Sequence, residues 1–371
     1  MATWDVIVVG LGAMGSSALY QLSRRGLRVL GIEAFAPGHR LGSSHGESRV
    51  IRLAYHEHPS YVPLLHRAYA LWSELEAESG QDLLTITGGL MIGPPESELV
   101  SGALHSARLH GLEHALLTAA EARRRYPAFQ LADHEIALWE PRSGFVRPER
   151  CISTFLDQAR RHGAEVRFEQ PVRAWSADEV RTDADTFRAQ HLIFACGARM
   201  SKVLGAGIPP VTAERAVLFW LQPARPDVFT DSPIYLWETR DKQIFYGFPH
   251  VDWPGVKVAM HHTGEFCDPD SVDRSVSPRD EAVLRAAIVD RLPALNGPVA
   301  DSLVCLYENS PDGHFIIDRL PDRPNVVYAA GFSGHGFKFA SVVGEILADL
   351  VTHGSATPDA DFLRAGRVLP A

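Results

Sequence analysis

The chain opens with an apolar run, a glycine-rich turn and a longer apolar stretch. Residues 5–9 predict a β-strand, the segment after the turn predicts a helix to about residue 25, and residues 28–33 predict a second strand. Strand, helix and strand in this order are typical of a parallel βαβ unit. The sequence therefore predicts an α/β fold that begins with a Rossmann-like unit.

Helical periodicity returns after a polar stretch at 38–52. Ser60 stands where it could cap a helix and Gly80 where it could end one. The apolar positions between them recur at helical spacing: Tyr61, Leu64, Leu65, Ala68, Leu71, Trp72 and Leu75. A further helix is predicted over 148–162. Short strands follow it at 165–168, 172–175 and 192–195.

The segments VLFWLQP, IFYGFP and VKVAMH, between about residues 215 and 262, alternate in the manner of strands. They predict an antiparallel sheet. After an acidic loop at 267–281 the pattern predicts a helix to about 291, strands around 304–307 and 325–330, and a last helix over 339–350. We expect a mixed α/β and α+β protein in which an antiparallel-sheet substrate domain (86–144 and 215–304) is inserted into a nucleotide-binding domain (1–85, 145–214 and 305–371).

Composition fits a globular protein of this size. The 371 residues are 46% apolar and 22% charged, which is typical of globular proteins and argues against disorder. Basic residues number 36 and acidic residues 45, for a net charge of -9, and no long basic block is present. Nucleic acid is therefore not an expected partner.

Cysteine usage and the first apolar stretch bear on the cellular location. The four cysteines are widely spaced without a CxxC pair, which argues against a disulfide framework and a zinc site, so we expect no metal and a reducing compartment. Residues 6–23 carry no charge, but glycines and serines interrupt them and no basic residue precedes them. We expect neither an export signal nor a membrane partner, and place the protein in the cytoplasm.

The first turn carries a nucleotide-binding fingerprint. Gly10, Gly12 and Gly15 directly follow a strand and begin a helix, where the backbone can approach a pyrophosphate. Glu33 ends the second strand, where a carboxylate binds the adenosine ribose. Ala13 and Met14 lie between the glycines and are expected to share the cofactor contacts. This fingerprint does not distinguish FAD from NAD.

Five later motifs carry a family resemblance. They are GSSHGESRVIR (42–52), YVPL (61–64), YGFP (246–249), CLYENSPDGHFIID (305–318) and GFSGHGFKFAS (331–341). In this order they resemble the monomeric sarcosine oxidase and N-methyltryptophan oxidase family of the D-amino-acid-oxidase superfamily. The resemblance implies a monomer with FAD that oxidises an N-alkyl amino acid. Hydride transfer to the flavin and hydrolysis would give formaldehyde and the demethylated amino acid, with O2 reduced to hydrogen peroxide.

The resemblance also implies a set of cofactor residues. Cys305 matches the position that forms a thioether with the flavin 8α-methyl group, and His45 and Arg49 match positions near the flavin ring. The remaining implied cofactor contacts are Ser43, Ser44, Val172, Gly197, Gly334, Gly336, Phe337 and Lys338. Ser44 and Glu47 depart from the histidine and aspartate that the family commonly carries there.

Substrate and oxygen residues are implied in the same way. Arg52 and Lys338 match the positions that bind the substrate carboxylate, and two cations suit that task. Lys257 matches the position that activates oxygen. The remaining implied positions are Tyr246, His261 and Tyr307 around the substrate amine, and Gly334 and Trp237 on the substrate side, with Trp237 in the loop before YGFP.

Other functions stay open at this point. The substrate could be a cyclic amino acid such as pipecolate or proline, or a glycated amino acid. A flavin dehydrogenase with a non-oxygen acceptor would keep the same motifs, although Lys257 argues against it. A regulatory dinucleotide-binding protein would not need Arg52, Lys257 and Lys338, and an NAD dehydrogenase would not need Cys305 in its motif.

Overall fold

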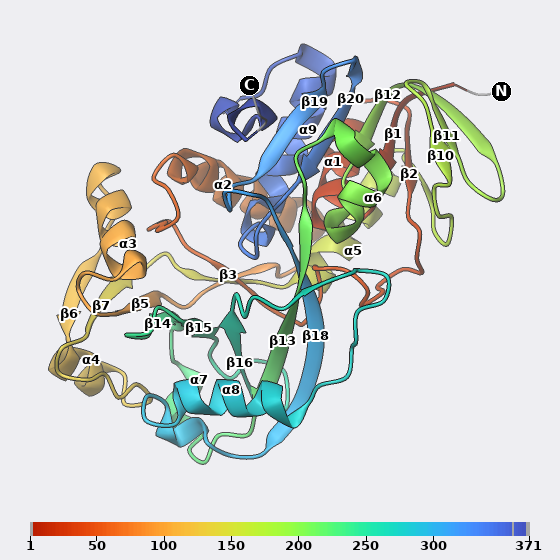
Figure 1. Ribbon diagram of the computed structural model, residues 1–371. Helices are drawn as coiled ribbons and strands as arrows, with labels where there is room; N and C mark the ends of the chain where they lie inside the picture. The colour runs from red at the N-terminus through yellow and green to blue at the C-terminus, as the bar shows by residue number, and fades with distance from the viewer. Residues whose placement is uncertain (1–2, 358–359, 369–371) are drawn as a thin grey trace.

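The computed structural model describes residues 3–357 and 360–368. A mostly parallel sheet forms one half of the molecule, and the predicted βαβ unit begins it (Figure 1). The strand order is β10-β11-β12-β1-β2-β9, with β20 beside β12 and β19 beside β20. The strands are β1 (Thr3–Val9), β2 (Val29–Ile32), β9 (Glu165–Arg167), β10 (Ala174–Trp175), β11 (Glu179–Arg181), β12 (Thr186–Phe194), β19 (Ile316–Leu320) and β20 (Arg323–Ala330).

Helices cover both faces of this sheet. The first face packs on α1 (Ala13–Ser23), α2 (Tyr61–Ser79), α5 (Pro148–Arg161) and α9 (Ala340–His353). The other face packs on α6 (Met200–Leu204). Because the sheet is covered on both sides, its central strands are continuously apolar, as the sequence of β1 already indicated.

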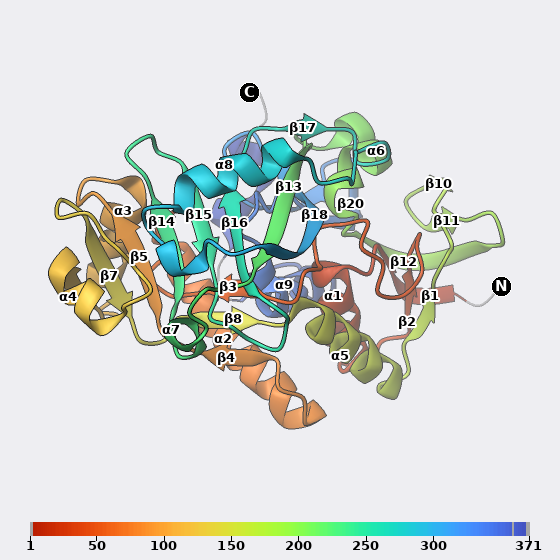
Figure 2. The same ribbon diagram turned by 90° about the horizontal axis from the view of Figure 1, so that it is seen from below.

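A second sheet forms the other half, and Figure 2 shows α8 lying across it. Its order is β17-β13-β16-β15-β14-β5-β7-β6, with β18 also paired to β13. Its strands are β5 (Gly89–Gly93), β6 (Ala115–Thr118), β7 (Ile136–Glu140), β13 (Thr212–Leu221), β14 (Ile234–Glu238), β15 (Ile244–Gly247), β16 (Val256–His261), β17 (Phe266–Cys267) and β18 (Val299–Asn309). The helices of this half are α3 (Glu98–Leu109), α4 (Ala119–Arg125), α7 (Asp227–Thr230) and α8 (Pro278–Ile288).

The antiparallel pairing predicted for 215–262 is confirmed for β13, β15 and β16. One junction is parallel, between β14 and β5, so the sheet is mixed. The two strands are far apart along the chain, and no local pattern could indicate their direction. A small sheet of β3 (Arg49–Ile51), β8 (Gly144–Val146) and β4 (Leu84–Ile86) lies between the halves.

Three local predictions need correction. Residues 234–238 form strand β14 rather than a loop. Helix α8 begins at residue 278, inside the expected acidic loop, because Ser277 and Asp280 form a capping box. Ser60 stands at the N-cap of α2 but makes no side-chain capping bond, whereas Gly80 ends that helix in the left-handed conformation, as predicted.

The long strand β18 bears on the proposed domain boundary. It pairs with β13 from residue 299 to residue 309, across the division proposed at 304/305. Figure 1 shows β13 and β18 reaching from the lower half toward the upper one. The division of the chain into two discontinuous domains therefore stays a proposal, with β18 as the strand that joins them.

Within the described ranges, no helix has both the length and the apolar character that a membrane crossing requires.

Candidate functional site

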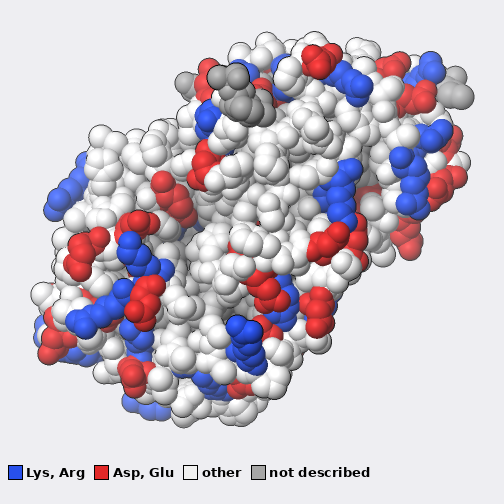
Figure 3. All heavy atoms as spheres, in the orientation of Figure 1, with Lys and Arg blue, Asp and Glu red and all other residues white. Residues whose placement is uncertain are grey.

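A deep cavity of about 890 Å³ lies between the two halves. This volume is within the range of roughly 300–1,000 Å³ that is usual for small-molecule and cofactor sites. Residues from the first turn, the 38–52 loop, β18 and the loop before α9 line it. Acidic and basic side chains are interspersed over the face of the molecule that Figure 3 shows. The cavity therefore brings together segments that lie far apart along the sequence.

The glycine turn forms one end of the cavity. Gly10 has φ of +87°, and a Cβ there would lie 2.5 Å from the carbonyl oxygen of Ala195. A Cβ on Gly15 would lie 1.8 Å from the carbonyl oxygen of Gly10. Glu33 lines the same end, and its Oε2 accepts a hydrogen bond of 2.7 Å from the Leu11 amide. The turn is thus a backbone cradle at a helix N-terminus, as a dinucleotide pyrophosphate requires.

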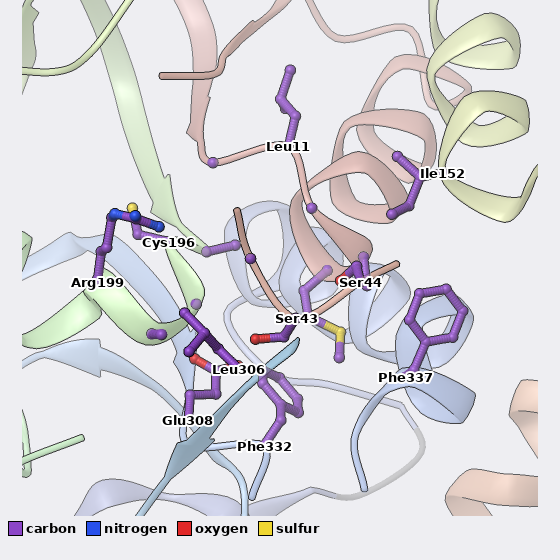
Figure 4. A pocket seen from close by; sticks show the side chains of 18 of the residues that line it. Leu11, Ser43, Ser44, Ile152, Cys196, Arg199, Leu306, Glu308, Phe332 and Phe337 are labelled. Carbon is purple, nitrogen blue, oxygen red and sulfur yellow. The ribbon is translucent and has the colours of Figure 1, made fainter. Parts of the chain in front are cut away.

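Most of the predicted cofactor contacts reach the cavity. Those that line it are Gly10, Gly12, Ala13, Met14, Glu33, Ser43, Ser44, Arg49, Val172, Gly197, Gly334, Gly336, Phe337 and Lys338. Figure 4 shows Ser43, Ser44 and Phe337 on opposite sides of the space from Cys196 and Arg199. Gly15 packs behind the turn, where it allows the close approach of helix and strand.

The wall around Cys305 joins β18 to the 42–49 loop. Cys305 is 1% exposed, and its Sγ lies 3.4 Å from Nη2 of Arg49. Nη2 of Arg49 also donates to the carbonyl oxygens of Ser43 and His45. The Nε2 of His45 lies 3.2 Å from the carbonyl oxygen of Val304, and burial with the nearby Arg49 charge lowers the pKa of His45 to about 3. His45 is therefore neutral and positions the loop from behind the cavity wall.

Lys257 supports the same loop from β16. Its Nζ donates to the carbonyl oxygens of Gly46 and Ser48, at 2.5 and 2.7 Å, and lies 3.3 Å from Oγ of Ser48. Its ammonium also faces the Phe248 ring at 4.9 Å. Burial lowers the pKa of Lys257 well below the usual lysine value, and the Arg49 charge adds to this effect. Lys257 thus supports from behind a loop whose residues 42–44 and 49 line the cavity.

Tyr246, His261 and Tyr307 converge on the other end of the cavity. Nδ1 of His261 lies 3.1 Å from the Tyr307 hydroxyl, and the two tyrosines share a hydrogen bond. Burial raises the pKa of both tyrosines and lowers the pKa of His261. All three side chains are therefore uncharged near neutral pH, and they form a polar wall without a strong base.

Two buried cations, Arg52 and Lys338, lie beside this wall. Nη2 of Arg52 lies 2.8 Å from each carboxylate oxygen of Glu57, and its guanidinium covers the Tyr55 ring at 4.4 Å. Lys338 donates to the carbonyl oxygen of His335 at 2.6 Å, and its ammonium lies 5.2 Å from the Tyr55 ring. Burial, with the Arg52 charge, lowers the pKa of Lys338 to about 7.

Sequence reasoning missed several lining residues, among them Glu57, His335, Leu236, Phe332 and Glu308. His335 lies inside the GFSGHGFKFAS motif, and Glu57 follows Arg52 by five residues, so proximity along the chain was an available signal for both. Glu308 follows Cys305 by three residues, but nothing in its own residue type indicated a place in the cavity wall.

Trp237 does not reach the cavity as predicted. Its ring is fully buried in the core of the second sheet, stacked on Phe245 at 5.6 Å, and its Nε1 donates to Glu135. Because successive side chains of a strand point to opposite faces, Leu236 lines the cavity instead. The expectation that Trp237 closes or extends the substrate space is therefore wrong.

In the described part of the chain, no three His, Cys, Asp or Glu side chains are grouped closely enough to hold a metal ion.

The glycine cradle, the carboxylate of Glu33 and the elongated cavity define a dinucleotide-binding protein with a second, substrate-facing half. The family described as FAD dependent oxidoreductase matches residues 5–350. The chain belongs to this DAO family, and it is an FAD-dependent oxidoreductase. The residues present fit FAD, since Gly10 and Gly15 let the strand, the turn and the helix approach closely enough for the turn's backbone to line the cavity.

Individual relatives agree with this family. A monomeric sarcosine oxidase of Streptomyces avermitilis is 44% identical over 366 residues, covering 95% of this chain and 94% of the relative. An N-methyl-L-tryptophan oxidase of Yersinia pestis is 34% identical over 353 residues, covering 93% and 94%. The fold is shared with NikD, an unusual amino acid oxidase (TM-score 0.86, 24% identity, 98% of both chains), and with glycine oxidase from Geobacillus kaustophilus (TM-score 0.82, 21% identity, 100% of both chains).

The position of Lys338 leads to a prediction about pH. Below its pKa of about 7 the side chain is charged, and above it the charge is lost, so we expect a simple carboxylate to bind less tightly as the pH rises through this range. Propionate is a suitable ligand because it has no amine to titrate, and the visible spectrum of the flavin reports its binding. In Lys338→Arg the charge persists, and the dependence between about pH 6 and 9 should disappear. A dissociation constant that does not change over this range in the unaltered protein would exclude Lys338 from carboxylate binding.

Proposed function

We propose that this protein oxidises the secondary amine of an N-methyl amino acid of the sarcosine or N-methyltryptophan type and passes the electrons to O2. The observation that carries the proposal is the pairing of two buried cations, Arg52 and Lys338, with an uncharged polar wall in one cavity. The sarcosine oxidase and N-methyl-L-tryptophan oxidase relatives support this substrate class.

Bound FAD would supply the hydride acceptor and then reduce oxygen. The residues of the chain would bind and orient the substrate. Arg52 and Lys338 would hold its carboxylate. Tyr246, His261 and Tyr307 would surround its amine. A neutral amine is needed for hydride loss from the adjacent carbon. Nearby positive charge and desolvation both favour that neutral form. Hydrolysis of the resulting imine would release formaldehyde and the demethylated amino acid. O2 would be reduced to hydrogen peroxide.

The test is an anaerobic titration followed by air. Sarcosine, N-methyltryptophan, pipecolate and a glycated amino acid are added separately while the flavin absorbance is recorded. We expect an N-methyl amino acid to bleach the flavin band and air to restore it with hydrogen peroxide formed. Bleaching only by pipecolate or by a glycated amino acid would replace the substrate, and bleaching without recovery in air would indicate a dehydrogenase.

We also propose that the flavin is covalently attached through Sγ of Cys305. The thiolate is the nucleophilic form of cysteine, and Arg49 supplies a positive charge at 3.4 Å. Gly42 and Ser43, whose carbonyl oxygens lie 4.0 and 3.6 Å from Sγ, line the cavity, so the sulfur lies against a loop of the cavity wall.

Replacement of Cys305 tests the attachment directly. Acid precipitation of the unaltered protein should leave the yellow colour in the pellet, whereas the Cys305→Ser protein should release its FAD into the supernatant. Cys151→Ser is the matched control, since Cys151 is also buried but lies in α5. Release of all the flavin from the unaltered protein would contradict the proposal.

The monomeric state and the cytoplasmic location are proposals of the same kind, supported by the resemblance and the sequence pattern. Light scattering on the purified protein and fractionation of the source cells would test them.

A further inference from the structure

Glu308 projects into the cavity from β18, and the mechanism above gives it no task. Figure 4 shows its side chain beside Leu306, close to Cys196 and Arg199. The residue is 7% exposed. Its carboxylate is hydrogen-bonded by the Phe332 amide, but no described residue offers a hydrogen bond to Oε2. A buried carboxyl group thus faces the cofactor space with one oxygen free.

Such a group is costly unless a ligand completes it. A buried polar atom without a partner costs roughly 1–3 kcal/mol, and more when the group is charged. Burial raises the pKa of Glu308 to about 8, which reflects the same cost. Within the described chain this side chain accepts the bond from the Phe332 amide through one oxygen, while the backbone bond from the Ser333 amide to the carbonyl oxygen of residue 308 would persist with any residue there.

The position of Glu308 along the cavity indicates which part of FAD it meets. A Cβ on Gly197 would lie 3.9 Å from its Oε2, and residue 197 follows β12, whose end packs on the pyrophosphate turn at Gly10. The flavin ring is proposed to lie at Cys305, which comes three residues before Glu308 on β18 and contacts Arg49. The carboxyl group therefore lies between the two ends of the cofactor.

The chemistry of FAD leaves one partner there. The phosphates would be held at the glycine turn, where backbone N–H groups of the helix N-terminus can meet them. The chain that links the pyrophosphate to the ring is the ribityl group, whose hydroxyls are neutral hydrogen-bond donors. We propose that Glu308 is a cofactor-binding residue whose free carboxyl oxygen accepts a hydrogen bond from a ribityl hydroxyl of FAD. This inference rests on the assignment of FAD and on the proposed ring end beside Cys305, and it is independent of the substrate.

The first test measures flavin release from the holoprotein. It is made in the Cys305→Ser background so that the flavin can dissociate, and the fluorescence of released FAD gives the dissociation constant on dilution. We expect Glu308→Leu to weaken FAD binding about tenfold, as the loss of one hydrogen bond to a buried polar group would do. Glu308→Gln keeps an acceptor and should stay within about threefold of the parent. Exposed Glu113→Leu is the control and should change nothing.

The second test locates the partner atom. Again in the Cys305→Ser background, FAD is exchanged for its 2′-, 3′- or 4′-deoxyribityl analogue. Each dissociation constant is measured for the protein that keeps Glu308 (the Glu308 protein), for Glu308→Gln and for Glu308→Leu. We expect one analogue to bind about tenfold more weakly than FAD to the Glu308 protein and equally well to Glu308→Leu. If Glu308→Leu does not fold, the comparison of analogues within the Glu308 protein still identifies the hydroxyl.

Two outcomes would overturn the inference. In the first, each analogue loses the same affinity in the Glu308 protein as in Glu308→Leu, so that no ribityl hydroxyl depends on the carboxyl group. In the second, none of the analogues loses affinity for the Glu308 protein. Because the readout is FAD binding, a failure of the proposed amine oxidase activity would leave this test intact.

Discussion

Lys257→Met should slow reoxidation of the reduced flavin by O2 by up to about three orders of magnitude while leaving anaerobic reduction by substrate nearly unchanged. The first electron transfer to O2 makes the superoxide anion. A unit positive charge about 4 Å away stabilises an anion by up to about 4 kcal/mol at an effective dielectric of about 20, which corresponds to about three decades in rate. Stopped-flow mixing of the reduced protein with aerated buffer measures the effect.

The surroundings of Lys257 add a pH signature to this prediction. Its three ammonium donors meet three acceptors, the carbonyl oxygens of Gly46 and Ser48 and the Ser48 hydroxyl. Burial lowers its pKa, so the charge and the oxygen rate should decline at a lower pH than an exposed lysine would give. In Lys257→Met this decline should vanish.

A matched control separates this effect from a general change of charge. Lys242→Met removes an exposed lysine from the turn between β14 and β15 and should react with oxygen at the original rate. An unchanged oxygen rate in Lys257→Met would remove Lys257 from the oxygen reaction and leave it as a support for the 46–48 loop.

The parts of the fold that the sequence predicted well depend on short-range interactions. Gly10 has a positive φ, and Gly15 lies against the carbonyl oxygen of Gly10, so both requirements arise within a few residues of the same turn. Helix α2 ends at Gly80 for the same local reason. The site residues in the five motifs could likewise be named because the motifs are contiguous.

The parts that the sequence did not predict depend on long-range packing. Whether Leu236 or Trp237 faces the cavity depends on whether residues 234–238 are a strand and on which neighbour they pair with. Their neighbour β5 lies in a distant, earlier part of the chain. A tryptophan near a substrate loop suggested a contact with substrate, but the pairing turns its ring into the core, where Phe245 covers it.

The acidic residues of the cavity illustrate a second limit. The family resemblance implies Arg52 and Lys338 as partners of an amino-acid carboxylate, and charge complementarity agrees with two cations there. Neither gives a reason to expect Glu57 beside them. In the structure Glu57 binds Arg52 with both oxygens and has its pKa lowered well below the usual value by the Arg52 charge, against the opposing effect of burial. A buried arginine needs a counter-ion when no substrate is bound, and only the folded chain reveals which residue provides it.

Arg52→Met should therefore lower kcat/KM for the N-methyl amino acid by on the order of a hundred- to a thousandfold, mainly through KM. Truncating one partner of a buried charge pair costs roughly 2–5 kcal/mol in binding, and each 1.4 kcal/mol is tenfold. Arg52→Lys keeps the charge but loses the planar fork, and an intermediate loss is expected. Steady-state kinetics with the two variants, at matched flavin content, measure both effects.

The same substitution should also shift the titration of Lys338. The Arg52 charge lowers the pKa of Lys338, and the Glu57 charge raises it. Without Arg52, the Glu57 carboxylate would be the charge that still acts on Lys338, and the pKa of Lys338 should rise. We expect the decline of propionate binding to move from about pH 7 to a higher pH in Arg52→Met. Lys338 would then retain its charge where the unaltered protein has lost it, which would partly offset the missing guanidinium at alkaline pH. An unchanged KM together with an unshifted titration would show that Arg52 serves only as the structural partner of Glu57, and the substrate carboxylate would have to bind elsewhere in the cavity.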